Sequence, residues 1–263
     1  MWLRLRTILD KEWAEVFKNR MVLLTVALMP VLFTALPLLV LFVMPGGEEM
    51  GDSADMPEMF AAACGQTMTT SECLQIYLVD EFLLLYMMMP LAIPIAIAAY
   101  SIVGEKTTRS LEPLLATPIT TEELLLGKGL AAVLPAVLVT WLCFGVFLLL
   151  APLSGITPAV RAHIFGPTWL LAVLVLGPLM AVAAVHVAVI VSARVSDPRT
   201  AEQVSMVVIV PLMAVLFGQL AGVIVLNPLF MLISIGVMLV ADTGLIYLGA
   251  RLFQRETILT RWK

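Results

Sequence analysis

Few polar residues fall within the long apolar stretches of this chain, and they are the first place to look for buried chemistry. Asp242 lies near the middle of one such stretch, where a carboxylate costs about 2.5–3.5 kcal/mol on insertion scales. It should therefore face protein, water or a partner. We predict Asp242, His186, Tyr100 and Gln219 as residues that line an internal path. The alternative is packing, with Asp242 hydrogen-bonded to a residue such as Tyr100 or His186.

The sequence lacks the motifs of nucleotide-hydrolysing and metal-dependent catalytic sites. A P-loop requires Gly-x-x-x-x-Gly-Lys-Ser/Thr to wrap phosphates and hold magnesium. Here Gly127-Lys128 is followed by Gly129, and Glu122 stands where the first glycine should be. His163 and His186 have no cysteine or carboxylate at metal-ligand spacing, so no metal site is predicted. We expect no catalytic residue and no cofactor bound by this chain.

The composition requires lipid as the solvent for much of the chain. Of 263 residues, 61% are hydrophobic and 13% are charged, whereas soluble domains have about 45–50% apolar and about 25% charged residues. A membrane-spanning helix needs about 20 apolar residues, and six stretches are long enough. They are Met21–Met44, Phe82–Val103, Leu130–Ala151, Pro167–Val191, Val204–Leu226 and Leu229–Ala250. We predict an all-α integral membrane protein, with residues 1–263 forming one domain of six transmembrane helices.

The basic residues are concentrated on one side of the predicted membrane. Short cytoplasmic loops retain Lys and Arg. If the N-terminus is inside, the inner segments hold 14 of the 15 basic residues and the outer segments hold only Arg161. The inner segments are 1–20, 104–129, 192–203 and 251–263. Both termini are therefore expected to be cytoplasmic.

The predicted outer loop, residues 45–81, carries eight acidic residues and no basic one. A solvated face explains such a run, and a vestibule that attracts cations is the alternative. The loop also contains Cys64 and Cys73, which are expected to form a disulfide if this face is oxidising; two unpaired thiols are the alternative. Cys143 falls in the third span and is expected to pack there.

Residues 1–20 precede the first span and have the pattern of an amphipathic helix. One face carries Trp2, Leu5, Leu9, Trp13 and Val16. Such a helix, with tryptophan rings at the level of the lipid headgroups, is predicted to lie in the cytoplasmic interface. The alternative is a cytosolic helix that packs on a partner.

Seven prolines fall within the predicted spans, where the missing N–H and the ring would kink a helix. They are Pro30, Pro37, Pro90, Pro94, Pro135, Pro178 and Pro211. The run Met87–Met89 is expected to be packing material or to face lipid, because methionine fills irregular gaps.

The segment 104–129 is unusually long for a connection between two bundle helices, where about 2–8 residues suffice. Thr107–Ala116 is predicted to form a short helix that Pro118 ends. Thr120 and Glu123 then form a capping pattern that begins the next helix. A short helix between two spans has the shape of a docking element, although a simple connector is the alternative.

The same segment carries a motif of fixed spacing. It reads Gly104-Glu105-Lys106, Leu111-Glu112-x-Leu114-Leu115-x-Thr117-Pro118 and Glu123-Leu124-Leu125-x-Gly127-Lys128. This pattern resembles the cytoplasmic loop of ABC transporter permeases of the type-2 exporter family. The resemblance covers essentially the whole chain, up to the closing Gly249-Ala250-Arg251-Leu252-Phe253-x-Arg255-Glu256.

The resemblance implies that this loop is a coupling helix, seated in a groove of a separate ATPase subunit that binds ATP and magnesium. It implies two ATPase copies and a second permease chain, identical or related, in a prokaryotic plasma membrane, with no nucleic acid as partner. The residues expected to contact the ATPase are Glu105, Arg109, Leu111, Glu112, Leu114, Leu115, Thr117 and Pro118, with Arg194, Asp197 and Arg199 of the second inner loop.

Two other functions compete with an exporter permease. A secondary transporter or channel without an ATPase should have several ionisable residues within the membrane, and only Asp242 and His186 fall inside the predicted spans. A membrane sensor or anchor would detect a ligand through the outer loop and signal through the inner one.

Overall fold

The computed structural model describes residues 2–18, 20–43, 69–107 and 121–252 of the chain, and these residues contain helices and no strand. The first half comprises α1 (Trp2–Lys18), α2 (Arg20–Val43), α4 (Thr70–Tyr86), α5 (Met89–Thr107), α7 (Thr121–Leu150) and a 3-10 turn η1 (Ala151–Ser154). The second half comprises α8 (Pro158–Ile164), α9 (Pro167–Leu171), a π-helical segment η2 (Ala172–Leu176), α10 (Gly177–Ser192), α11 (Pro198–Ser205), a 3-10 turn η3 (Met206–Ile209), α12 (Val210–Leu220) and α13 (Pro228–Leu252).

Six helical runs are long and apolar enough to cross a membrane, which confirms the predicted number of spans. They are Val22–Val43, Ser71–Gly104, Glu123–Ser154, Pro158–Ser192, Pro198–Leu220 and Pro228–Gly249. The second run begins well before Phe82, where its start was predicted. Asp80 and Glu81, which were assigned to the outer loop, therefore lie on α4 within a helix that continues toward the core.

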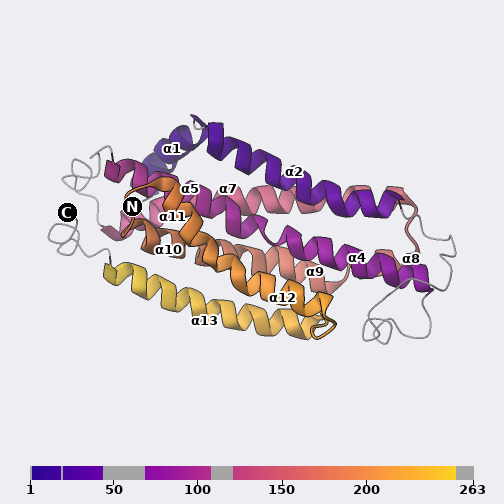
Figure 1. Cartoon of the computed structure of the whole chain (residues 1–263). Coiled ribbons are helices and arrows are strands. Elements are labelled where there is room, and N and C mark those ends of the chain that lie inside the picture. The colour runs from indigo at the N-terminus through magenta and orange to yellow at the C-terminus, as the bar shows by residue number, and fades with distance from the viewer. Residues whose placement is uncertain (1, 19, 44–68, 108–120, 253–263) are drawn as a thin grey trace.

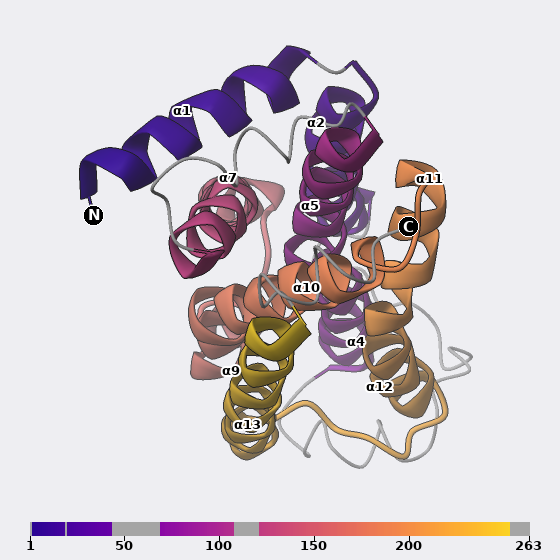
Figure 2. The ribbon, with the colours of Figure 1, turned by 90° about the vertical axis from the view of Figure 1, so that its left-hand side faces the viewer.

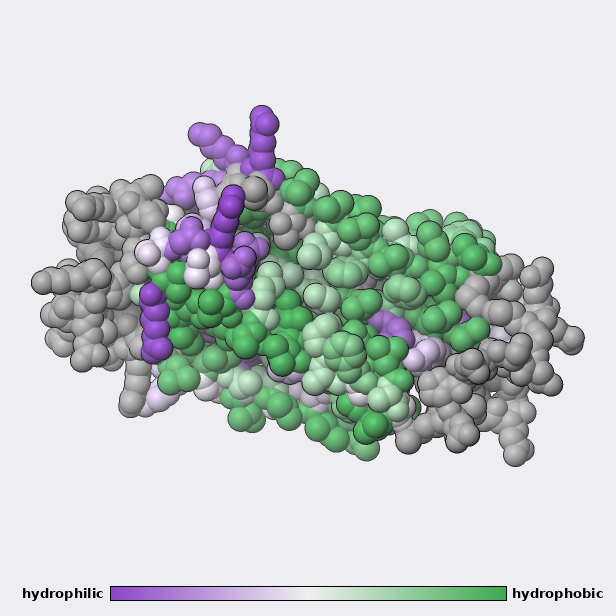
Figure 3. Space-filling model, viewed as in Figure 1, coloured by the Kyte–Doolittle hydropathy of each residue, from purple (hydrophilic) through white to green (hydrophobic). Residues whose placement is uncertain are grey.

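The run formed by α4 and α5 is the centre of the bundle (Figure 1). In its most apolar stretch 83% of the residues are buried, against 11% in the run that contains α13. Helices α2, α12 and α13 lie at the outside and expose large apolar side chains such as Leu24 and Val240. Figure 3 shows hydrophobic side chains along most of the bundle and hydrophilic ones gathered at the end where α1 and α11 lie. An exposed apolar surface of this kind is what contact with lipid requires.

Three of the seven prolines that were predicted to kink the spans lie directly after interruptions in the α-helical geometry. A two-residue turn precedes Pro90 in the first turn of α5, the π-helical segment η2 precedes Pro178, and the 3-10 turn η3 precedes Pro211. Proline has no N–H for the carbonyl four residues earlier, and its ring crowds that carbonyl. The preceding turn therefore departs from α geometry. The other four prolines lie within α2, α5 and α7.

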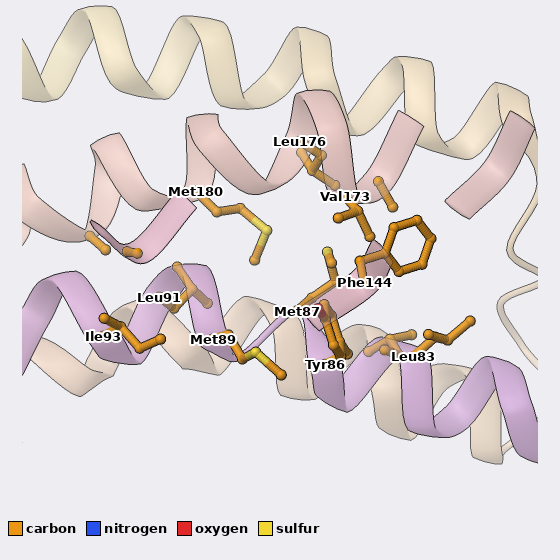
Figure 4. Close-up of a cluster of buried hydrophobic side chains, with 14 of the residues drawn as sticks. Leu83, Tyr86, Met87, Met89, Leu91, Ile93, Phe144, Val173, Leu176 and Met180 are labelled. Carbon is orange, nitrogen blue, oxygen red and sulfur yellow. The ribbon is translucent and has the colours of Figure 1, made fainter. Parts of the chain in front are cut away.

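The interruption between α4 and α5 is buried in the main core (Figure 4). Met87 and Met89 are 3% and 0% exposed and pack among residues of α7 and α10, so these two methionines fill the core. The Tyr86 hydroxyl donates to the carbonyl of Thr140 on α7 at 2.5 Å, and the Tyr86 and Phe144 rings are 6.1 Å apart. These contacts hold the end of α4 against α7.

Helix α1 lies transverse to the long helices, as the view along the bundle shows (Figure 2). It packs against α7, α2 and α5. The face that it buries is formed by Leu5, Ile8, Glu12 and Val16. This face is rotated from the predicted one, since Leu9 and Trp13 are only partly buried and Glu12 takes a central place. Protein, and not lipid alone, therefore covers α1.

Candidate functional site

The helix ends that border the predicted coupling segment meet at one end of the bundle, which we call the α1 end. It contains α1, the Thr107 end of α5, the Thr121 start of α7, the Ser192 end of α10, and α11 (Figure 1). Glu105 lies in the last turns of α5. The other predicted contact residues of this segment lie outside the described residues and remain predictions. They are Arg109, Leu111, Glu112, Leu114, Leu115, Thr117 and Pro118.

Three side chains from α1, α5 and α7 form a buried polar cluster at the α1 end, which we call the Glu12 cluster. Lys128 Nζ donates to Glu12 Oε1 at 2.8 Å and to Ser101 Oγ at 2.8 Å. The Ser101 hydroxyl donates to Glu12 Oε2 at 2.5 Å. Glu12 is 2% exposed, and Lys128 and Ser101 are each 7% exposed. Both carboxylate oxygens are thus occupied, and the two charges neutralise each other.

Close packing of α1 on α7 brings this cluster together. A Cβ atom placed on Gly127 would lie 2.8 Å from Ile8 Cγ2, so any other residue here would require the Ile8 side chain or α1 to shift. The Trp13 indole Nε1 donates to the carbonyl of Ala131 at 3.1 Å. Gly127 and Ala131 lie on either side of Lys128 along α7, so these contacts set the height at which Lys128 meets Glu12.

Sequence reasoning did not identify the Glu12 cluster. Lys128 was interpreted only as part of a motif, and Glu12 and Ser101 were not singled out. One signal was available, because Glu12 stands four residues from both Ile8 and Val16 and so falls on an apolar stripe of α1. A charge in such a stripe indicates a buried partner.

The predicted contact residues of the second inner loop, Arg194, Asp197 and Arg199, are exposed between α10 and α11 or at the start of α11. Asp197 caps α11, since its Oδ2 accepts from the Thr200 backbone amide at 2.9 Å and from the Thr200 hydroxyl at 2.9 Å. These hydrogen bonds lower the pKa of Asp197. Asp197 therefore has a structural role whether or not a partner contacts it.

The four predicted path residues do not form one cluster of hydrogen bonds. Asp242 is 5% exposed on α13, and neither of its carboxylate oxygens has a hydrogen-bond partner among the described residues. His186 Nδ1 instead pairs with the carbonyl of Val182 at 2.8 Å, and Tyr100 is exposed. The alternative in which Tyr100 or His186 hydrogen-bonds to Asp242 is therefore wrong, and a path lined by these residues remains a prediction. Gln219 on α12 is 1% exposed, and its Oε1 accepts no hydrogen bond from any of the described residues.

A second buried polar cluster lies at the opposite end of the bundle, where α8 is found. Asp80 Oδ1 on α4 accepts from Trp169 Nε1 at 2.8 Å and pairs with His163 Nε2 at 2.7 Å. The next residue, Glu81, is 8% exposed and neither carboxylate oxygen has a hydrogen-bond partner in the described part of the chain. The helical runs that are apolar enough to cross a membrane therefore contain more ionisable residues than Asp242 and His186 alone.

The cysteines divide into bonded and free. Cys73, buried in α4, is disulfide-bonded, and Cys143 on α7 is a half-buried free thiol. Cys64 lies outside the described residues, so its pairing with Cys73 remains a prediction.

Comparison with known proteins agrees with the helical membrane architecture. A search of the curated proteins finds no match to this chain. A family model described as ABC-2 family transporter protein matches residues 6–256, from the first half of α1 to beyond α13. Since this range is nearly the whole chain and contains all six apolar helical runs, the chain belongs to the ABC-2 family of membrane transporter permeases.

Proposed function

We propose that this chain is the membrane-spanning permease subunit of an ATP-driven exporter, and that it is coupled through residues 104–129 to a separate ATPase. The complex would contain two ATPase copies and two permease chains in a prokaryotic plasma membrane, with both permease termini in the cytoplasm. ATP and magnesium would bind to the ATPase. The permease itself would perform no catalysis and bind no nucleic acid.

One observation supports this coupling route above the others. The segment 108–120 joins α5 to α7, and α5 belongs to the most buried run of the bundle. A displacement of this segment would thus reach the central helix directly. A partner that held only the exposed helices α2 or α13 would have to act through their loosely buried faces.

In this mechanism, ATP closes the two ATPase subunits and moves the coupling segments that rest on them. Rigid movement of packed helices then opens the permease pair alternately to the two sides of the membrane. Arg194, exposed between α10 and α11, and Arg199, exposed in the first turn of α11, would form a second contact, with acidic residues of the ATPase. Leu111, Leu114 and Leu115 would be the apolar anchors in its groove.

The proposal is tested by isolating the tagged chain from its native membrane in nanodiscs and identifying what co-purifies by mass spectrometry. A stoichiometric ATPase, with ATP hydrolysis stimulated by the permease, is the expected result. The variant Arg109→Glu with Leu115→Asp should reduce both recovery of the ATPase and stimulation, because it reverses a charge and removes an anchor. Arg161→Glu, on α8 at the far end of the bundle, is the control and should change neither. Recovery of the permease alone, or full stimulation by the double variant, would refute the coupling route.

A further inference from the structure

We propose that the Glu12 cluster is a positioning joint, which makes α1, α5 and α7 move as one unit when the segment between α5 and α7 is displaced. This inference rests on the proposed function for the part that concerns coupling. The part that concerns how α1 is held depends only on the geometry of the chain. Glu12, Ser101 and Lys128 are positioning residues in this account, and none of them contacts cargo or nucleotide.

The location of the cluster suits this role. Ser101 lies six residues before the Thr107 end of α5, and Lys128 lies seven residues after the Thr121 start of α7. At a rise of about 1.5 Å per residue, both side chains lie about 10 Å from the ends of the two helices that border the segment. Movement of these helix ends would therefore meet the cluster before it meets the core around Tyr86 and Phe144.

The hydrogen bonds form a closed ring, which fixes position in a way that apolar packing does not. Each of the three side chains bonds to both others. Sliding any one helix along its neighbours would break two of the three bonds at once. Apolar contacts are non-directional, so Ile8, Val16 and their neighbours oppose a shift in register only through the shape of their packing, whereas the ring opposes it with hydrogen bonds that must break.

The burial of the ion pair is difficult to explain by stability alone. Taking two charges out of water carries a desolvation cost that often cancels their attraction, and apolar residues of similar volume are commonly as stable. Exposed pairs, such as Arg6 and Asp10 on the same helix, avoid that cost because both side chains remain largely exposed. An ion pair placed under α1 at 2% and 7% exposure thus favours a role in specifying geometry.

The first measurement tests the joint in the full-length permease alone, in nanodiscs, by amide hydrogen exchange of α1. A single helix that leaves its packing site frays quickly, so exchange in α1 reports release from α7. Ser101→Ala removes one member of the ring and should raise exchange in α1 by at least about tenfold, the lower end of the range for a hydrogen bond to a charged group. Arg6→Gln breaks the exposed pair on the same helix and is the matched control, with no change expected.

The second measurement uses the permease–ATPase complex and separates positioning from stability. The double variant Glu12→Leu with Lys128→Met removes both charges, so it should keep the thermal stability and assembly of the wild type. We expect its permease-stimulated hydrolysis to fall at least fivefold in kcat while KM for ATP is unchanged, because the nucleotide site is on the other chain. Lys128→Arg alone keeps the positive charge and the N–H donors, and this variant should retain most of the wild-type stimulation.

The outcomes distinguish the two proposals. Unchanged exchange in α1 for Ser101→Ala would refute the joint, and so would wild-type kcat in the stable double variant. If Ser101→Ala releases α1 but the wild-type chain stimulates no ATPase, the joint is supported and the proposed function is refuted. Release of α1 together with loss of stimulation supports both.

Discussion

At the scale of single residues, the α1 end of the bundle depends on how one buried charge is compensated. Glu12 accepts from Lys128 and Ser101 with both of its oxygens, and protein surrounds all three side chains. When one member of such a buried pair is substituted, most of the loss in stability comes from the remaining charge, which is left buried without a partner. Replacing one member of the ion pair should therefore lower the free energy of unfolding much more than replacing both members together.

Lys128→Met alone is predicted to lower the free energy of unfolding by about 3–5 kcal/mol, since Glu12 is then buried without a counter-charge. Adding Glu12→Leu should recover most of this loss. Thermal unfolding in detergent, compared for the two variants and the wild type, is the measurement. Arg6→Met, which removes an exposed partner at 3.9 Å, is the control and should cost less than about 1 kcal/mol. A double variant as unstable as Lys128→Met would contradict the prediction.

Asp197 gives a prediction of pH dependence outside the membrane. Hydrogen bonds from Thr200 lower the pKa of Asp197 in the folded chain, so the cap contributes stability above the unfolded pKa of about 3.9 and loses it as pH falls through the folded pKa. Amide exchange in α11, corrected for the intrinsic effect of pH, should therefore rise below about pH 4. Asp197→Asn keeps a capping side chain that does not titrate. The same rise in this variant would show that another group is responsible.

At the scale of elements, the close contact between α1 and α7 depends on glycine at position 127, which has no side chain to separate the two helices. Gly127 and Gly129 lie two residues apart on α7 but meet different surroundings. A Cβ atom on Gly127 would approach Ile8 to 2.8 Å, whereas one on Gly129 would meet Val185 at an ordinary 3.8 Å. The first glycine faces α1 and the second faces α10, so the two positions form a matched pair.

Gly127→Ala is predicted to destabilise the chain by about 1–3 kcal/mol through overpacking against Ile8, and to increase amide exchange in α1. Gly129→Ala should be neutral or slightly stabilising, because alanine favours a helix over glycine by about 1 kcal/mol. Combining Gly127→Ala with Ile8→Val, which removes one methyl group, should recover part of the loss. Equal melting temperatures for the two alanine variants would contradict this reading of the contact.

At the scale of the whole molecule, the α1 end and the α8 end of the bundle differ in chemistry. The α1 end carries the exposed residues Arg194 and Arg199, and the opposite end buries Asp80 against His163 and Trp169. The distribution of basic residues predicts that the α1 end faces the cytoplasm. This orientation is also what contact with a cytoplasmic ATPase requires.

Orientation can be measured by introducing one cysteine at a time and labelling it in intact cells with a membrane-impermeant maleimide, after Cys143→Ala removes the free thiol of α7 and with the unsubstituted Cys143→Ala chain as the background. Ala162→Cys, at an exposed position on α8, should be labelled from outside. Ser196→Cys, exposed between α10 and α11, should be labelled only after the cells are permeabilised. The reverse pattern would place the α1 end outside and would exclude coupling to a cytoplasmic ATPase through residues 104–129.

The sequence by itself determined the features that depend on short stretches of chain. Six apolar stretches predicted the six helical runs, because length and hydrophobicity decide what can span a bilayer. The helix predicted to run into the third span is present as α7, Thr121–Leu150, whereas the capping pattern includes Thr120, which lies outside the described residues, and stays a prediction. The motif of residues 104–129 indicated the transporter family that the comparison then showed.

Only the tertiary structure decided which polar residues meet. Glu12 and Lys128 are separated by 116 residues, Ser101 and Glu12 by 89, and Asp80 and Trp169 by 89. Periodicity predicts that α1 has an apolar face, but it does not predict the rotation of α1 about its axis that buries Glu12. That rotation depends on the space that Gly127 of α7 leaves for Ile8. Asp242 and Glu81 were likewise expected to have partners or solvent, and packing left them buried with neither among the described residues. Local patterns decide that a helix forms, whereas the pairing of side chains depends on the height and rotation at which distant helices pack.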